Sequence, residues 1–314
     1  MARPDNVTVA KTAMSSTDLA TAGALNDQQF NEFFDLVRDQ PTLLSDIDFQ
    51  PMTALKAKLE SYEFGGSITF KGREGVAATT EQRGALVASK VELDAQLLQC
   101  EISVTEKQRL AILIRDNLDN YARTKMAMQF ALDQETAVVT AVSGVGYLLT
   151  DAFDGLIEQV PSGNVIDMTS NTQKVTDDAF FQAFLTIEAK YRRDKANMRI
   201  YCASDVLAAY NKYITTRQTG LGDIRIVDGT QKSYWNGILM WELPSMPDGS
   251  FLMTNRHNCV WGVVNNDVIP YMDTEPSAGI WLYGLRMYGD VKYREAEAAA
   301  YYKGLDALLS ITTV

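Results

Sequence analysis

Few side chains in this sequence have the type and spacing that catalysis requires. His257 is the single histidine and lies in Asn255-Arg256-His257-Asn258, between two predicted strands. A Ser-His-Asp triad would depend on that histidine, and the Gly-x-Ser-x-Gly motif of serine hydrolases does not occur. We therefore predict that His257 is a turn residue and not a general base.

Two other patterns could bind a cofactor or a metal, and both are better explained by local structure. Gly144-Val145-Gly146 lacks the third glycine of a dinucleotide-binding loop and follows a predicted helix instead of a strand. Asp177-Asp178 begins a predicted helix, and Asp133 with Glu135 lies on a helix face that we expect to be exposed; carboxylates there usually cap or are solvated. The sequence thus predicts no catalytic, cofactor-binding or metal-binding residue, and a protein that is not an enzyme.

The cysteines give no sign of a metal site or a disulfide framework. Cys100, Cys202 and Cys259 lie far apart, without the short spacings of zinc ligands, and their odd number leaves one unpaired under any scheme. We expect buried, reduced thiols. No apolar run approaches the roughly 18 residues of a membrane span, and residues 1–13 lack the apolar core of a signal peptide, so we expect a protein made in the cytoplasm.

Composition and charge exclude several functional classes. The chain has 314 residues, of which 46% are hydrophobic and 22% charged, as in a globular protein of one large or two smaller domains. The net charge of −11 argues against binding to nucleic-acid phosphates. One tight basic group stands out, and we expect it to lie at the carboxyl end of a helix, where cations are favoured: Lys190, Arg192, Arg193 and Lys195.

The amino-terminal part predicts an extended arm followed by a short helix. Residues 1–25 are rich in Ala, Ser, Thr and Asp without a sustained period. In the helix that follows, Phe30, Phe33 and Phe34 form one apolar stripe, and Pro41 ends it. This face must be covered, either by the chain's own core or by an adjacent subunit.

A long hairpin is predicted over residues 63–96. Its glycine-rich tip carries the charged residues Lys71, Arg73, Glu74, Glu81 and Arg83. From Val87 to Ala95 apolar and polar residues alternate with the period of two that indicates a strand. Such a hairpin has no core of its own, so it should lie across another surface.

The rest of the chain predicts a long helix, an α/β layer and late strands. The amphipathic helix covers 106–142, with a start either at the Thr105 capping box or near Asp116. A second helix should begin at Thr176 and continue through Tyr191, before a buried strand at 198–203 and a helix capped by Ser204. The predicted loop and late strands are 217–222, 223–228, 237–243, 250–254, 259–264 and the paired runs 280–290 and 297–302.

This order of elements resembles the plan of Hong Kong 97-like major capsid proteins of tailed bacteriophages, from about residue 30 onward. Several local sequences agree with that family's axial-domain strand and helix, its Pro-x-x-Pro segment and its closing strands: Tyr201-Cys202-Ala203-Ser204, Trp235-Asn236-Gly237-Ile238-Leu239, Leu243-Pro244-Ser245-Met246-Pro247, Arg286-Met287-Tyr288-Gly289-Asp290 and Ala298-Ala299-Ala300-Tyr301-Tyr302-Lys303-Gly304.

The resemblance implies an α+β fold in five parts. These are an amino-terminal arm with a short helix (1–55), an extended loop with flanking strands (56–100), a peripheral-domain spine helix (101–146), an axial domain (147–265) and peripheral-domain strands (266–314). It also implies contacts between subunits through exposed residues of these parts: Phe30, Phe33, Phe34, Lys71, Arg73, Glu74, Glu81, Arg83, Arg217, Asp223, Asp273 and Glu275.

The function implied is self-assembly into pentamers and hexamers of an icosahedral head shell around double-stranded DNA. Its expected partners are further copies of itself and portal, scaffolding and decoration proteins, without a membrane. The acidic composition suits a wall that does not adhere to DNA. Two alternatives are an encapsulin, whose family places a cargo-binding helix near the amino terminus where this chain has an arm, and a monomeric α/β binding module.

Some members of the family join subunits by an isopeptide bond between a Lys of the extended loop and an Asn of a late peripheral loop. This sequence offers Lys71 and Lys90 but has no Asn between Asp267 and Val314. Asp273 is a poor substitute because an ionised carboxylate does not expel a leaving group as a carboxamide expels ammonia. We therefore expect a shell held together without covalent bonds.

Overall fold

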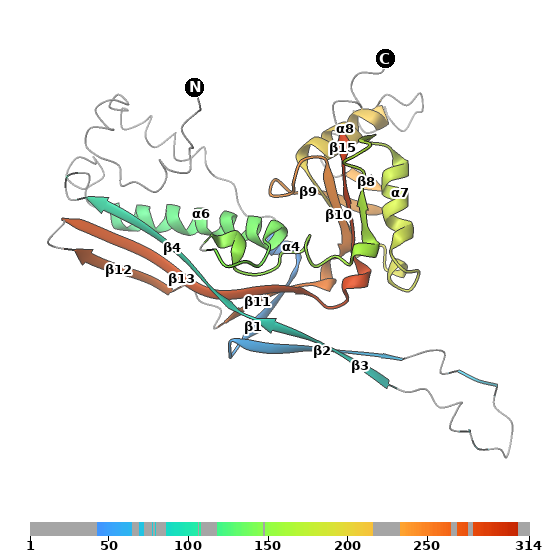
Figure 1. Ribbon diagram of the computed structural model, residues 1–314, viewed down its shortest axis with the longest axis horizontal. Coiled ribbons are helices and arrows are strands. Elements are labelled where there is room, and N and C mark those ends of the chain that lie inside the picture. The colour runs from blue at the N-terminus through green and yellow to red at the C-terminus, as the bar shows by residue number, and fades with distance from the viewer. Residues whose placement is uncertain are drawn as a thin grey trace.

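The computed structural model describes residues 43–64, 69–71, 77, 79, 86–105, 107, 118–146, 148–215, 233–264, 269–275 and 279–306. The predicted arm and the helix containing Phe30, Phe33 and Phe34 lie outside the described residues. Figure 1 shows an elongated sheet with a helix along it, a compact α/β part beside one end, and a hairpin that extends away from both.

The elongated sheet has five strands in the described part of the chain: β1 (Asp48–Met52), β4 (Gln96–Thr105), β11 (Cys259–Val264), β12 (Ile269–Glu275) and β13 (Ile280–Tyr293). β13 is the common strand, since β4 pairs antiparallel along one edge while β11 and β12 follow each other along the other. β1 extends the sheet by parallel pairing with β11.

Alternation along β13 decides which face of this sheet is buried. Tyr283, Leu285, Met287 and Val291 are at most 5% exposed, whereas Arg286 is exposed. The helix α6 (Leu118–Thr140) covers the buried face, on which its own Met126, Phe130 and Val138 are also buried. Both sets of residues therefore belong to one hydrophobic core, as a half-buried sheet under an amphipathic helix requires.

The predicted helix over 106–142 corresponds to α6, and residues 108–117 lie outside the described chain. The helix ends at Thr140 because the backbone then forms different hydrogen bonds: Val142 N–H donates to the carbonyl oxygen of Thr150 at 2.9 Å. A short 3₁₀ turn, η2 (Leu149–Asp151), follows this loop.

The compact part is built on a sheet with six strands among the described residues, in the order β5, β14, β10, β7, β9, β8. Its elements are η3 (Ser162–Asn164), β5 (Val165–Asp167), α7 (Asp177–Thr186), η4 (Tyr191–Arg193), β7 (Met198–Cys202), α8 (Ser204–Thr215), β8 (Ser233–Trp235), β9 (Ile238–Glu242), β10 (Ser250–Asn255) and β14 (Ala300–Lys303). A two-stranded pair, β6 (Gln173–Lys174) with β15 (Leu305–Asp306), lies beside it.

An aromatic cluster joins the helices to this second sheet. The ring of Phe180 on α7 lies 4.6 Å from that of Phe251, 5.1 Å from Tyr210 on α8 and 6.0 Å from Trp235. Phe251 also stacks on Tyr302 of β14 at 5.3 Å. Because these rings come from five different elements, they hold α7 and α8 on one face of the sheet.

One sequence prediction about strand pairing is wrong. The runs 280–290 and 297–302 do not pair with each other, since β13 remains in the elongated sheet while β14 pairs with β10 and β5. The run 259–264, placed with the axial region, pairs as β11 with β13 and β1. The chain passes between the sheets three times: from β4 through α6 to β5, from β10 through η5 (Arg256–Asn258) to β11, and from β13 through η6 (Ala296–Ala298) to β14.

The helix predicted from Thr176 through Tyr191 is shorter than expected. α7 ends at Thr186, because Ile187 already has extended backbone angles (φ −66°, ψ 135°). The basic group therefore does not lie at a helix end: Arg192 and Lys195 lie over the ring of Phe184 at 5.3 Å and 5.4 Å. These cations contact an aromatic face instead of a helix dipole.

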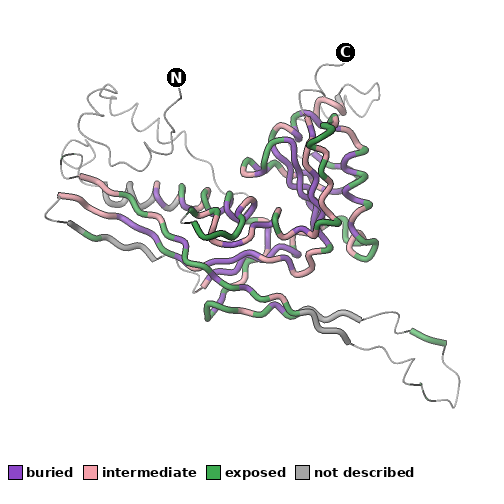
Figure 2. Tube along the Cα trace, in the orientation of Figure 1, coloured by how far each residue is buried: buried purple, intermediate pink, exposed green. Residues whose placement is uncertain are grey.

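The antiparallel pair β2 (Lys56–Phe64) and β3 (Leu86–Asp94) confirms a hairpin, but its first strand begins at Lys56, before the predicted range of 63–96. Leu59 and Leu93 are buried against Met52 and Val260 of the elongated sheet, while Glu92 and Asp94 are exposed, as the alternation predicted. Beyond this base both strands leave the body of the molecule (Figures 1 and 2). The base is thus the part of the hairpin that the subunit's own core supports.

Replacing Gly262 by Ala should loosen the hairpin base. A Cβ at Gly262 would lie 2.8 Å from Sδ of Met52 and 3.0 Å from Cδ1 of Leu93, so these buried side chains must move. We expect the free energy of unfolding in urea to fall by about 1–3 kcal/mol. The matched control is Gly163→Ala, where no atom lies within 4 Å of the added Cβ. Equal unfolding midpoints for the two variants would contradict the close packing at Gly262.

Candidate assembly interface

Three of the predicted contact residues lie in the described chain. Lys71 and Asp273 are exposed, and Glu275 ends β12 in register with Ile280. The others fall outside the described residues, so their contacts stay predictions: Phe30, Phe33, Phe34, Arg73, Glu74, Glu81, Arg83, Arg217 and Asp223.

The hairpin and the β12 end of the elongated sheet lie at opposite ends of the molecule's longest axis (Figure 1). They cannot form one site within a single copy. Each can contact a different neighbouring molecule, which is the arrangement that an extended lattice of identical subunits needs.

Ion pairs cover the solvent side of the hairpin base. Lys56 Nζ lies 3.1 Å from Asp94 Oδ2 and 3.8 Å from Glu92 Oε1, and Lys90 Nζ lies 3.7 Å from Glu60 Oε1. These side chains are 43–62% exposed, so water screens each pair strongly. The pairs set the charge of the surface more than they stabilise the fold.

A buried carboxylate fixes the root of the hairpin to the elongated sheet. Asp290 is 2% exposed and accepts hydrogen bonds from the backbone N–H of Asp94 at 2.9 Å and of Val291 at 2.8 Å. Burial raises the pKa of this carboxyl, and the two N–H groups and Lys292 oppose that rise. The end of β3 is therefore held against β13 at a fixed point. The sequence did not predict this role of Asp290.

A second carboxylate attaches the segment formed by α4 (Leu43–Asp46) and β1 to the compact part. Asp46 accepts a hydrogen bond from the Tyr201 hydroxyl at 2.8 Å, and its oxygens lie 3.4 Å from Arg199 Nε and 3.8 Å from Arg256 NH1. The side chains of Asp46 and Arg199 are only 6% and 11% exposed. This is a largely desolvated charge cluster between the two sheets.

The single histidine belongs to the same junction. His257 lies in η5, in agreement with the predicted turn, and its Nδ1 is 2.7 Å from Oδ1 of Asp48. The other oxygen of Asp48 lies 3.3 Å from NH2 of Arg294. The geometry assigns His257 to holding β1, without a nucleophile at hydrogen-bond distance among its described contacts.

Glu135 overturns the expectation of a solvated carboxylate on an exposed helix face. It is 4% exposed and accepts a hydrogen bond from the backbone N–H of Leu43 at 2.9 Å. The Ser245 hydroxyl donates to its other oxygen at 3.5 Å. Asp133, two residues earlier, is exposed as predicted. Glu135 is buried because α4 and the turn after β9 pack on that side of α6.

The remaining chemistry-bearing groups are structural. Burial raises the pKa of the Cys202 thiol to about 12, and it also raises the pKa values of Cys100 and Cys259, so none is poised to be a thiolate at neutral pH. No group of His, Cys, Asp and Glu among the described residues could hold a metal ion. None of the described helices is both long enough and apolar enough to cross a membrane.

Comparisons with known proteins find similarity in sequence and in fold. No family model matches the chain. Over 224 residues it is 25% identical to YqbE of Bacillus subtilis strain 168, assigned as a prophage capsid protein, with 71% of each chain covered. Among solved structures, a chain of the satellite phage P4 procapsid has a TM-score of 0.65 at 14% identity, covering 96% of this chain and 95% of that one.

The encapsulin SrpI complex of Synechococcus elongatus PCC 7942 is also similar, with a TM-score of 0.55 at 10% identity, covering 91% of this chain and 97% of that one. The fold is therefore that of shell-forming proteins. Of these two structures, the phage procapsid chain has the higher TM-score and covers more of this chain, 96% against 91%. The resemblance to Hong Kong 97-like phage capsid proteins is confirmed at the level of the fold.

Removing the carboxylate of Asp46 should destabilise the junction between the sheets. In Asp46→Ala, Arg199 would keep a buried charge and Tyr201 a buried hydroxyl without this acceptor. We expect a loss of about 3–5 kcal/mol in unfolding free energy, measured by urea titration. The control is Glu92→Ala, which removes an exposed partner of Lys56 and should leave the midpoint nearly unchanged. Similar small effects of both variants would refute the buried cluster.

Proposed function

We propose that this protein is the major capsid protein of a tailed bacteriophage or prophage. The observation that carries the proposal is the likeness of its fold, over 96% of the chain, to a subunit of a phage procapsid. The sequence similarity to YqbE supports the same class. In this function the subunits form pentamers and hexamers, and these form an icosahedral head around double-stranded DNA.

The shape of the subunit supports assembly on physical grounds. β2 and β3 continue beyond the small apolar cluster at Leu59 and Leu93 that anchors them (Figure 1). A hairpin of two strands gains little stability in water by itself. Contact with a neighbouring copy buries that area, and many such contacts over a shell provide its strength.

The two sheets correspond to the two proposed domains. The elongated sheet with α6 serves as the peripheral domain and the six-stranded sheet with α7 and α8 as the axial domain. β11 then belongs to the peripheral domain and β14 to the axial domain, which changes the boundaries expected from the sequence. The hairpin and the segment before Leu43 serve as connections to neighbouring subunits.

The proposed partners follow from the same function. Copies of the chain bind one another, and portal, scaffolding and decoration proteins complete the head. The net charge of −11 favours an inner wall that encloses DNA without binding a particular sequence. The protein acts in the virion after assembly in the host cytoplasm, as a structural component without an enzymatic role.

An encapsulin-type compartment is the second candidate, because the SrpI complex has a related fold. The two functions differ in the contents of the particle, which are DNA for a phage head and protein cargo for a compartment. The lower TM-score of the encapsulin, 0.55 against 0.65, favours the phage capsid.

The purified full-length protein should assemble. We expect light scattering to give pentamers, hexamers or particles in the megadalton range, and electron micrographs to show closed shells when the protein is expressed with the genes that neighbour it. Particles recovered from lysed cells should protect DNA from nuclease. A strictly monomeric protein at all concentrations and salt conditions would refute the proposal, and shells filled with protein cargo would favour the encapsulin.

Mature particles should contain no covalent links between subunits. Lys71 and Lys90 are exposed, but no Asn lies between residues 267 and 314 to accept them. Boiling in detergent and reductant should therefore give one band near 34.9 kDa on a gel. A ladder of oligomers that resists this treatment would contradict the expectation, and mass spectrometry of the ladder would identify the bond.

A further inference from the structure

Two apolar patches on the compact part contain large side chains that are about half exposed in the part of the chain that the structure describes. The first, the α7 patch, consists of Phe181 and Leu185, which are 52% and 51% exposed. They lie one helical turn apart and so share a side of the helix. Their neighbours Phe180 and Phe184 are buried against the six-stranded sheet. α7 thus has an inner aromatic side and a second, outer apolar side.

The second, the β8–β9 patch, lies on the opposite face of the same sheet. The ring of Trp235 lies 6.0 Å from Phe180 and 5.8 Å from Phe184, on the side of α7. Since side chains alternate along a strand, Tyr234 points to the other face, and it is 52% exposed. Leu239, its register partner, and Trp241 lie on that face too and are partly buried.

We infer that the α7 patch of one copy packs against the β8–β9 patch of the next copy around a ring. This inference rests on the proposed function, which requires rings of five or six subunits. In a ring each subunit makes a heterologous contact, so one surface must fit a different surface on the other side of the molecule. Two apolar patches on opposite faces of one sheet meet that requirement.

The chemistry of the two patches is also complementary. Arg192 and Lys195 lie over the ring of Phe184, next to Leu185 on α7. The β8–β9 patch offers the aromatic rings of Tyr234 and Trp241, whose faces attract such cations. A different partner protein would need only one of the patches, whereas a second copy explains both.

Crosslinking tests the pairing directly. In a Cys100→Ser background, where Cys202 and Cys259 remain buried, the double variant Leu185→Cys with Tyr234→Cys is treated with a short bis-maleimide after assembly. We expect a ladder on a denaturing gel that ends at pentamers or hexamers. The matched controls carry only one of the two new cysteines, Leu185→Cys or Tyr234→Cys, in the same background and should give monomers only. Dimers from a single-cysteine variant would show a two-fold contact and overturn the inference.

Substitution provides a second measurement. Phe181→Asp should leave the far-ultraviolet circular dichroism unchanged and reduce the yield of assembled particles at least tenfold. Val145→Asp is the control, because Val145 is fully exposed in the loop after α6 and belongs to neither patch. Normal assembly of Phe181→Asp, or shells in which the double-cysteine variant does not crosslink, would overturn the inference while leaving the proposed function intact. Absence of assembly in the unmodified protein would instead refute the proposed function.

Discussion

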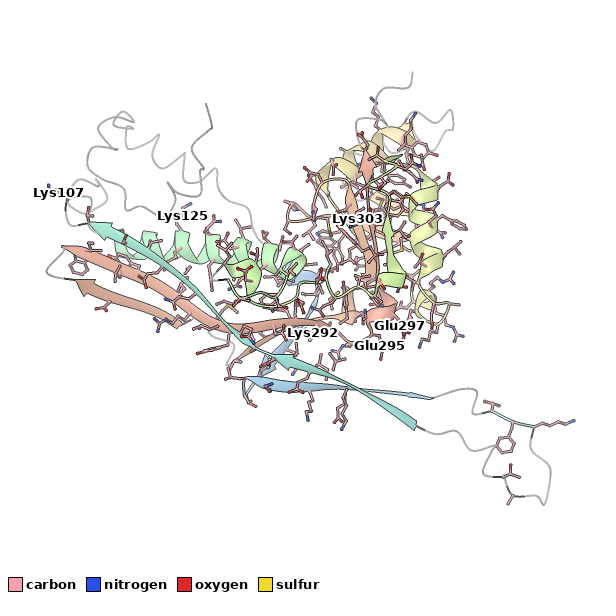
Figure 3. The ribbon with its side chains drawn as sticks, in the orientation of Figure 1. Lys107, Lys125, Lys292, Glu295, Glu297 and Lys303 are labelled. Carbon is pink, nitrogen blue, oxygen red and sulfur yellow. The ribbon has the colours of Figure 1, made fainter. Side chains whose placement is uncertain are left out.

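The structure depends on the two short turns, η5 and η6, through which the chain passes directly from a strand of one sheet to a strand of the other. After β10 of the six-stranded sheet the chain passes through η5 into β11 of the elongated sheet, and after β13 it returns through η6 into β14. Each sheet therefore contains a strand that directly follows a strand of the other sheet. Asn258 joins the two passages: its side chain donates to the carbonyl oxygen of Glu295 and accepts from the N–H of Glu295, both at 2.9 Å. Figure 3 shows Glu295 and Glu297 at this passage, with Lys292 on β13 before it. Because the side chain of Asn258 is buried, these paired bonds fix the relative position of the sheets.

Buried carboxylates extend this control to the outer segments. Asp46 connects α4 to β7, Glu135 connects α6 to α4 and to the turn after β9, and Asp290 connects β3 to β13. A buried ion costs desolvation free energy unless its hydrogen bonds are satisfied, so such groups add specificity of arrangement more than stability. Part of the acidic composition is therefore internal, and only the remainder contributes to the charge of the solvent-facing surface.

The sequence was sufficient for features that depend on local periodicity. Alternation placed Leu93 and Ala95 inside and Glu92 and Asp94 outside, and the amphipathic helix predicted over 106–142 agrees with the burial of Met126 and Phe130 on one side of α6. The sequence could not identify the pairing partners, because β11 and β14 are short runs that are buried almost throughout and carry no alternation to distinguish one sheet from the other. The burial of Glu135 and the position of the basic group also depend on tertiary neighbours, namely α4 in the first case and the ring of Phe184 in the second. Without knowledge of those neighbours, the sequence predicts a solvated carboxylate for Glu135 and a position at a helix end for the basic group.

Firm anchoring of the extended elements reduces what assembly must order. The hairpin is fixed at its root by Asp290 and by the close approach at Gly262, and β1 is fixed by Asp46 and Asp48 before the chain reaches the hairpin. An element that leaves the body in a defined direction loses less conformational freedom when it meets a neighbour than a freely jointed loop would. The same reasoning applies to the α7 and β8–β9 patches, which lie on a helix and on paired strands and not on long loops. In the proposed ring, contacts of this size would be weak singly, and the rigidity of the elements that carry them would let a closed ring combine them into a stable assembly.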